Sequence, residues 1–168
     1  MIDNTFAPAA NEAFSPARPR ALYTILFGGL TVGVLDGLAA TIIASLRGTS
    51  PGRVFQYIAS GLLGPDSFNH GSWTVLLGVL LHFLIASIVA TIYYFASLRL
   101  PILIRQAVVW GALYGIAVQL VMSRIVIPLS AAQALPFSLT GFLRSIVVHI
   151  FCVGLPVALF ARWSARAS

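Results

Sequence analysis

The stretch WTVLLGVLLHFLIASIVATIYYFAS, residues 73–97, decides the class of this protein. It contains no Asp, Glu, Lys or Arg, and its apolar run is interrupted only by one glycine, one histidine, two serines and two threonines. A helix rises about 1.5 Å per residue, so roughly 20 apolar residues cross a hydrocarbon core about 30 Å thick. Lipid offers the backbone no hydrogen-bond partner, and a segment within it must be helical. Residues 73–97 are therefore predicted to form a transmembrane helix.

Three more apolar runs have the length of a membrane span. The four predicted spans are residues 21–46, 73–97, 103–127 and 139–162. Glycine, proline and arginine gather between them, as expected where helices end. The sequence therefore predicts an all-α fold, an integral membrane four-helix bundle over residues 21–163. Residues 1–20 are polar and carry three prolines, which predicts a disordered tail.

The composition agrees with membrane insertion and argues against other classes. Of 168 residues, 59% are hydrophobic and 8% are charged, whereas a soluble domain carries roughly 25% charged residues. The net charge is +6, but the arginines flank separate apolar runs and form no basic stripe. The expected partner is therefore the lipid bilayer and not nucleic acid. No phosphate-binding glycine loop or paired carboxylates occur, so we expect no enzyme activity.

The first loop, about residues 47–72, is long enough to hold a short helix of its own. Ser50 stands where a helix N-cap would lie, with Pro51 at the first helical position, and Gly64-Pro65 ends the run. Apolar residues recur between them at helical spacing: Val54, Phe55, Ile58, Leu62 and Leu63. About 12 residues cannot span a bilayer. We predict a short interfacial helix, or one that dips into the bundle.

The distribution of arginine predicts the orientation, because cytoplasmic loops retain positive charge. With the N-terminus inside, six arginines lie on the cytoplasmic side and four on the opposite side. The six are Arg18, Arg20, Arg99, Arg105, Arg162 and Arg166, and the four are Arg47, Arg53, Arg124 and Arg144. Both termini are therefore predicted to be cytoplasmic.

Small residues recur at four-residue steps and predict the packing faces of the helices. The candidate packing glycines are Gly29, Gly33 and Gly37 in the first span, Gly78 in the second, and Gly111 and Gly115 in the third. Helices in lipid associate through such close-approach faces. The first-span glycines either pack within the chain or form a homo-oligomer through helix 1.

Four polar residues are predicted to share one depth. Asp36, His82 and His149 each lie about ten residues from span ends on the same side, which places them about 15 Å below one surface. Gln119 lies near that level on the small-residue face of the third span. Ionisable groups in a membrane are costly and face the protein interior. We therefore expect Asp36, His82, Gln119 and His149 to converge in the bundle core, and call them the polar layer.

Several roles are open for the polar layer. It can be a hydrogen-bonded structural plug with an Asp–His pair, a proton or ion relay, a metal or haem site, or a pocket for a small molecule or lipid headgroup. No His-rich spacing favours a metal, so no metal site and no cofactor are predicted. The function we expect is a small transport or proton-linked component. The alternatives are a structural or interaction protein and a haem- or metal-binding protein.

Several residues resemble a known family. They are Ser50-Pro51-Gly52-Arg53 after the first span, Gly78, His82 and Phe83 in the second, Gly111, Gly115, Met122 and Pro128 in and after the third, and His149 in the fourth. This layout resembles the YagU-like family of small bacterial inner-membrane proteins over roughly residues 25–160. The resemblance implies a four-helix protein of the bacterial inner membrane with histidines in its second and fourth helices. It implies no established reaction.

Overall fold

The structure is a computed structural model that describes residues 18–166. Over that range it contains helices and no strand, and four of the helical stretches are long and apolar enough to cross a membrane. These stretches are Leu22–Ser45, Gly71–Arg99, Ala107–Leu129 and Leu139–Arg166. The all-α four-helix fold is thus confirmed. Most of the predicted tail, residues 1–17, lies outside the described residues.

Three of the four spans contain a π-helical segment. The label η marks these three segments and also one 3-10 helix. In chain order the elements are η1 (Leu22–Gly28), α1 (Gly29–Ser45), α2 (Pro51–Leu63), the 3-10 helix η2 (Gly64–Asn69), α3 (Gly71–Arg99), α4 (Ile102–Arg105), α5 (Ala107–Val121), η3 (Met122–Val126), α6 (Ile127–Leu129), α7 (Leu139–Val148), η4 (His149–Gly154) and α8 (Leu155–Arg166).

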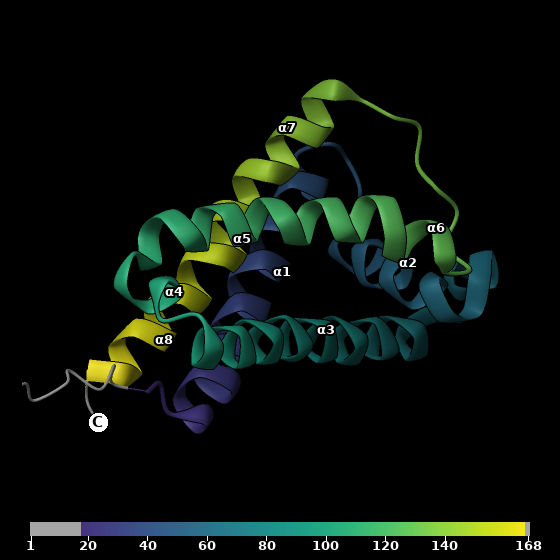
Figure 1. Ribbon diagram of the computed structural model, residues 1–168. Coiled ribbons are helices and arrows are strands. Elements are labelled where there is room, and N and C mark those ends of the chain that lie inside the picture. The colour runs from purple at the N-terminus through teal and green to yellow at the C-terminus, as the bar shows by residue number, and fades with distance from the viewer. Residues whose placement is uncertain (1–17, 167–168) are drawn as a thin grey trace, which may run out of the picture.

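The spans converge at one end of the molecule and spread apart at the other. Figure 1 shows the helices close together around α4 and α8, and separated towards α2, α6 and α7. α1 packs on α3, and α5 packs on η4 and α8. Side chains bridge α3 and α5, because the Tyr114 hydroxyl donates to the Val89 carbonyl at 2.7 Å. The two ends of the bundle therefore differ in how closely the backbones approach.

The close end owes its packing to residues with little or no side chain. Gly111, Gly115 and Gly154, called here the glycine seam, bring α5 against η4 and α8. A methyl group on Gly111 would lie 2.8 Å from Ala158 Cβ, and one on Gly154 would overlap the Gly111 backbone. Small apolar residues fill the adjoining core: Ala86, Ala90, Ala107, Val153, Val157, Ala158 and Ala161, with Val32, Val89, Tyr93 and Leu103. Two of the predicted packing glycines are thus placed in helix contacts.

The predicted third span, residues 103–127, differs from the observed one at its start. The helix breaks at Gln106, where φ is −113° and ψ is 47°, so α4 is a separate turn and the span runs from Ala107 to Leu129. The buried Tyr93 hydroxyl donates to the Leu103 carbonyl at 3.0 Å. In a continuous helix that carbonyl would accept from the amide four residues later. Because the helix breaks, the Leu103 carbonyl can accept from the buried Tyr93 hydroxyl. This contact joins two different helices, and apolar periodicity within one helix does not reveal it.

The short helix of the first loop is present as α2, and it packs along the first part of α3. Ser50 occupies the N-cap position with Pro51 at the helix start, and Gly64 ends the helix at a φ of 69°. Gly78 faces the backbone of Phe55, where a methyl group would overlap the Phe55 carbonyl. The Phe55 ring reaches the His82 ring, with centroids 6.1 Å apart. Of the two predicted placements, these contacts match a helix that reaches into the bundle.

The glycines of the first span face α3 within the same chain. A methyl group on Gly29 would lie 3.2 Å from the Ser87 Cα, and one on Gly33 would lie 2.5 Å from the Phe83 ring. One on Gly37 would lie 3.2 Å from His82 Nε2. The helix-1 glycine face is therefore used inside the chain. A homo-oligomer through helix 1 stays a prediction, and it would need another face of that helix.

The first and last described helices lie side by side. Thr24 Oγ1 and Ser164 Oγ are 3.2 Å apart and buried, and the Arg20 amide donates to the same Ser164 oxygen. α3 ends and α4 lies at this same end of the molecule (Figure 1). Four of the six arginines predicted to be cytoplasmic therefore lie at this end of the bundle: Arg20, Arg99, Arg105 and Arg166.

Candidate functional site

A cavity of about 490 Å³ opens between α3 and α5 at the spread end of the bundle. Residues of α1, α2, η3, α6, α7 and η4, together with Ser130 and Ala132 of the loop after α6, complete its wall. All four members of the polar layer line it: Asp36, His82, Gln119 and His149. Each comes from a different span, so all four spans contribute a polar side chain to one cavity. Most of the remaining lining residues are aliphatic, among them Val32, Leu81, Ile85, Val118 and Ile127.

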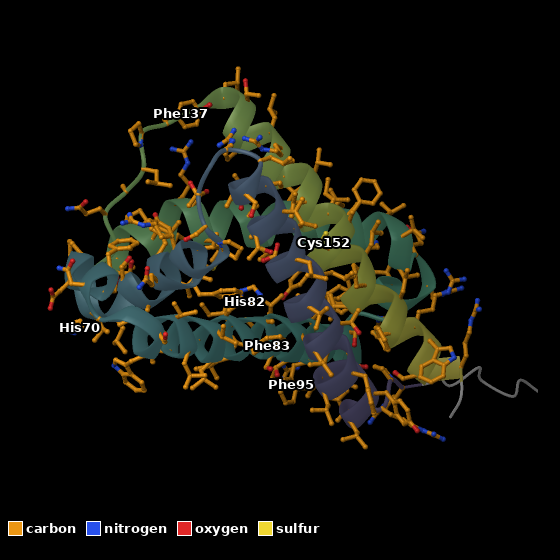
Figure 2. The ribbon with its side chains drawn as sticks, turned by 180° about the vertical axis from the view of Figure 1, so that it is seen from behind. His70, His82, Phe83, Phe95, Phe137 and Cys152 are labelled. Atoms are coloured by element: carbon orange, nitrogen blue, oxygen red, sulfur yellow. The ribbon has the colours of Figure 1, made fainter. Side chains whose placement is uncertain are left out.

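His82 joins α3 to α1. Its Nε2 lies 2.8 Å from the Gly33 carbonyl oxygen, and its ring is buried between Phe55 and Phe83 in edge-to-face contacts. Figure 2 shows the side chain directed away from α3 towards α1. A carbonyl oxygen only accepts, so Nε2 carries the proton and Nδ1 of the neutral ring is an acceptor. This hydrogen bond accounts for the contact between His82 of α3 and the glycine face of α1.

His149 is held by its own helix. Its Nδ1 lies 2.9 Å from the Ser145 carbonyl oxygen, one turn earlier, and the side chain is half-buried. The same reasoning puts the proton on Nδ1 and leaves Nε2 of the neutral ring as an acceptor. His149 therefore makes no interhelical hydrogen bond within residues 18–166. Its position in the wall is set by the helix, and its second nitrogen is not used by the bundle.

Asp36 and Gln119 make no hydrogen bond or ion pair within residues 18–166. Asp36 is half-buried and Gln119 is 8% exposed, and both line the cavity. An Asp–His pair, which the structural-plug alternative would contain, is not formed within residues 18–166: neither histidine nitrogen lies within ion-pair distance of Asp36. The helices spread at this level and hold the side chains around a space.

Among the described residues, 18–166, no arginine lines the cavity. Its titratable residues are Asp36, His82, His149 and Tyr57. Tyr57 projects from α2 and donates to the Gln133 carbonyl at 3.1 Å. Burial raises the pKa of the Tyr57 hydroxyl above its ordinary value, so the group remains a donor at physiological pH. Asp36 is thus the residue that brings a formal negative charge to a wall without a fixed positive one.

Two π-helical segments shape the wall. Met122, Ser123 and Val126 of η3 line the cavity, and His149 is the first residue of η4. Each segment ends two residues before a proline, Pro128 after η3 and Pro156 after η4. A proline within a helix lacks the amide hydrogen and its ring crowds the carbonyl four residues earlier. A π-turn there widens the helix, and such turns occur often at functional sites.

Several lining residues were not predicted from the sequence: Tyr57, Ser123, Ser130 and Ser145. The prolines at 128 and 156 were the available signal for the two π-segments beside them. Tyr57 carried no comparable signal, because its place depends on how α2 docks. Within residues 18–166, no three His, Cys, Asp or Glu side chains gather closely enough to share a metal ion. The haem- or metal-binding alternative stays a prediction.

Comparison with protein-family models, with curated proteins and with solved structures finds no match for this chain. The resemblance to the YagU-like family therefore stays a prediction.

Proposed function

We propose that this multi-pass membrane protein is a small transport component in which the cavity binds a solute and Asp36 exchanges protons. The observation that carries this proposal is the placement of Asp36, His82, Gln119 and His149, one from each span, around one cavity of about 490 Å³. Intramembrane acids and histidines that face an internal space often mark solute or proton pathways. Ligand sites between helices of a bundle are commonly apolar with a few polar groups, as this wall is.

The hydrogen bonding of the layer supports a binding role over a purely structural one. A structural plug should satisfy its polar groups within the protein, since unpaired ones are costly in a membrane. His82 meets that description through its bond to Gly33. Asp36 and Gln119 do not, because neither finds a partner within residues 18–166; no fully buried side-chain N or O atom in that range lacks one, so the polar atoms of these two residues remain accessible from the cavity that they line. The layer thus has unused hydrogen-bonding atoms on Asp36, on Gln119 and on the second ring nitrogen of each histidine, and water or a solute in the cavity would satisfy them.

The remaining parts of the proposal concern the setting. We place the protein in a bacterial inner membrane, with both ends of the chain in the cytoplasm and no catalytic activity of its own. The support for this orientation is the group of arginines near α4 and the end of α8. The cavity then opens nearer the opposite side, where α2 and the loop after α6 lie.

Proton movement in liposomes tests this function. Purified protein is reconstituted with an internal pH-sensitive dye, and a potassium diffusion potential is applied with valinomycin. Wild-type protein is expected to take up protons faster than protein-free liposomes, and Asp36→Asn is expected to return uptake to the protein-free level because the exchanging carboxyl is gone. Asp66→Asn is the matched control, since Asp66 is an exposed carboxylate bonded to His70 and Asn69 outside the cavity.

Equal uptake by wild-type protein and Asp36→Asn would contradict a proton-exchange role for Asp36. Folding of each variant is checked by its elution volume and its thermal midpoint in detergent, so that a loss of uptake is not confused with misfolding.

A further inference from the structure

We infer that the cavity selects a hydrophobic amine in its ammonium form: a small molecule with one positively charged N–H donor group and an aliphatic or aromatic body. This inference rests on the proposed function and names its solute class. It follows from three properties of the wall, namely its charge, its hydrogen-bonding polarity and its apolar surface.

The first property is the charge balance. Asp36 brings a carboxylate to the wall, and none of the arginines that the structure describes lines the cavity to neutralise it. Within residues 18–166 the carboxylate has no ion-pair partner. A half-buried carboxylate without a partner favours a cationic ligand, since pairing offsets the cost of removing its charge from water. An anionic ligand would meet repulsion from Asp36 and no compensating cation.

The second property is an excess of acceptors over donors. Gly33 and Ser145 carbonyls fix the protons of the two histidines on Nε2 of His82 and Nδ1 of His149. The other nitrogen of each neutral ring is an acceptor, and Asp36 adds carboxylate oxygens. Gln119 offers an acceptor as well as donors. An ammonium group presents donors only, so it is complementary to this set of groups.

The third property is the apolar remainder of the wall. Aliphatic side chains from α1, α3, α5 and η3 surround the polar layer, including Val32, Ile85, Val118 and Val126. A bare inorganic cation would leave this surface unused in a cavity of about 490 Å³. An amine with an apolar body buries that surface and places its charge beside Asp36, which adds hydrophobic stabilisation to the ion pair.

The test compares three ligands of one shape with different charge. 2-Phenylethylamine, 2-phenylethanol and phenylacetate are titrated into the purified full-length protein in detergent at neutral pH, and binding is followed by calorimetry. The amine is expected to bind most tightly. Asp36→Asn is expected to weaken amine binding on the order of tenfold or more, because the ion pair is lost. Asp66→Asn is expected to leave it unchanged.

Tighter binding of phenylacetate, or amine binding that Asp36→Asn leaves intact, would overturn the inference. Absence of amine binding together with proton uptake that depends on Asp36 would also overturn it while the proposed function stands. Absence of both would remove the proposed function too. Amine binding is then measured in nanodiscs with and without phosphatidylethanolamine to identify the natural source of the ammonium group. Competition by that lipid would point to a headgroup, and lack of competition to a free amine, with the ligand chemistry supported in either case.

Discussion

The two ends of this bundle are built from the same kinds of helix but with opposite packing. At the close end, Gly111, Gly115 and Gly154 let backbones touch, and small residues such as Ala107 and Ala158 are completely buried. At the spread end, α3 and α5 separate around a cavity of about 490 Å³. The close end satisfies polar groups internally, as in the hydrogen bond that the Tyr93 hydroxyl donates to the Leu103 carbonyl and the one between the Thr24 and Ser164 hydroxyls. The cavity end leaves Asp36 and Gln119 without partners in the described chain.

The contrast shows how a small membrane protein can contain a polar cavity while its helices stay associated. Helices in lipid are held together by close contact and not by water, so tight backbone approach is the main source of association. The glycine seam supplies that contact for η4 and α5, and His149 lies at the start of the same π-segment. The spans can therefore spread beyond the seam without separating, and the polar layer can face a space.

The largest expected effect is on the free energy of unfolding, when one carbon is added at the close end and, for comparison, one at the spread end. Gly154→Ala places a methyl group against the backbone of Gly111 and Gly115, so it should lower the free energy of unfolding by about 3 kcal/mol. Val118→Leu adds the same volume to the cavity wall, where space is present. It should change the free energy of unfolding by less than about 1 kcal/mol. Denaturation with SDS in mixed micelles measures both. Equal costs at the two positions would remove the distinction between the two ends.

A smaller effect separates the two histidines of the polar layer. His82→Phe removes the bond to the Gly33 carbonyl of α1 and should cost about 1 kcal/mol of unfolding free energy. His149→Phe removes a bond within its own helix and should cost clearly less. The same SDS denaturation ranks the two variants. If His149→Phe proved the more destabilising, the assignment of His82 as the interhelical link would be wrong.

The smallest effect lies outside both regions, in the exposed η2 turn. Hydrogen bonds from His70 and Asn69 and the charge of His70 hold the pKa of Asp66 below its ordinary value of 3.8. A carboxyl with a lowered folded-state pKa stabilises the fold above its unfolded pKa, and this contribution is lost as the pH falls through the folded value. The difference in thermal midpoint between wild-type protein and Asp66→Asn should thus be small at neutral pH, decline as the pH falls below about 3.8, and vanish only below the lower pKa of the folded state. A difference that grows on acidification would show that the sign is wrong.

The sequence was sufficient for the spans, because long apolar runs leave little alternative in lipid. It also indicated the depth of the polar layer, since a helix converts residue number into height along the bundle. It could not reveal the cavity, because the gap between α3 and α5 depends on how Gly78 seats Phe55 of α2 and how the glycine seam pulls η4 onto α5. The break at Gln106 was hidden for the same reason: the acceptor for Tyr93 is a tertiary requirement.

The contact between η1 and α8 has a consequence for how the protein is made. Thr24 and Ser164, which meet in a buried hydrogen-bonding contact, are separated by 140 positions in the chain. Membrane helices are stable individually before they associate, and chains are synthesised from the N-terminus at about 5–20 residues per second. The first span must therefore wait in the membrane, with its α8 contact surface facing lipid, until the chain has grown by about 140 more positions and α8 has emerged. The contact between η1 and α8 is thus a late step in the assembly of the four spans.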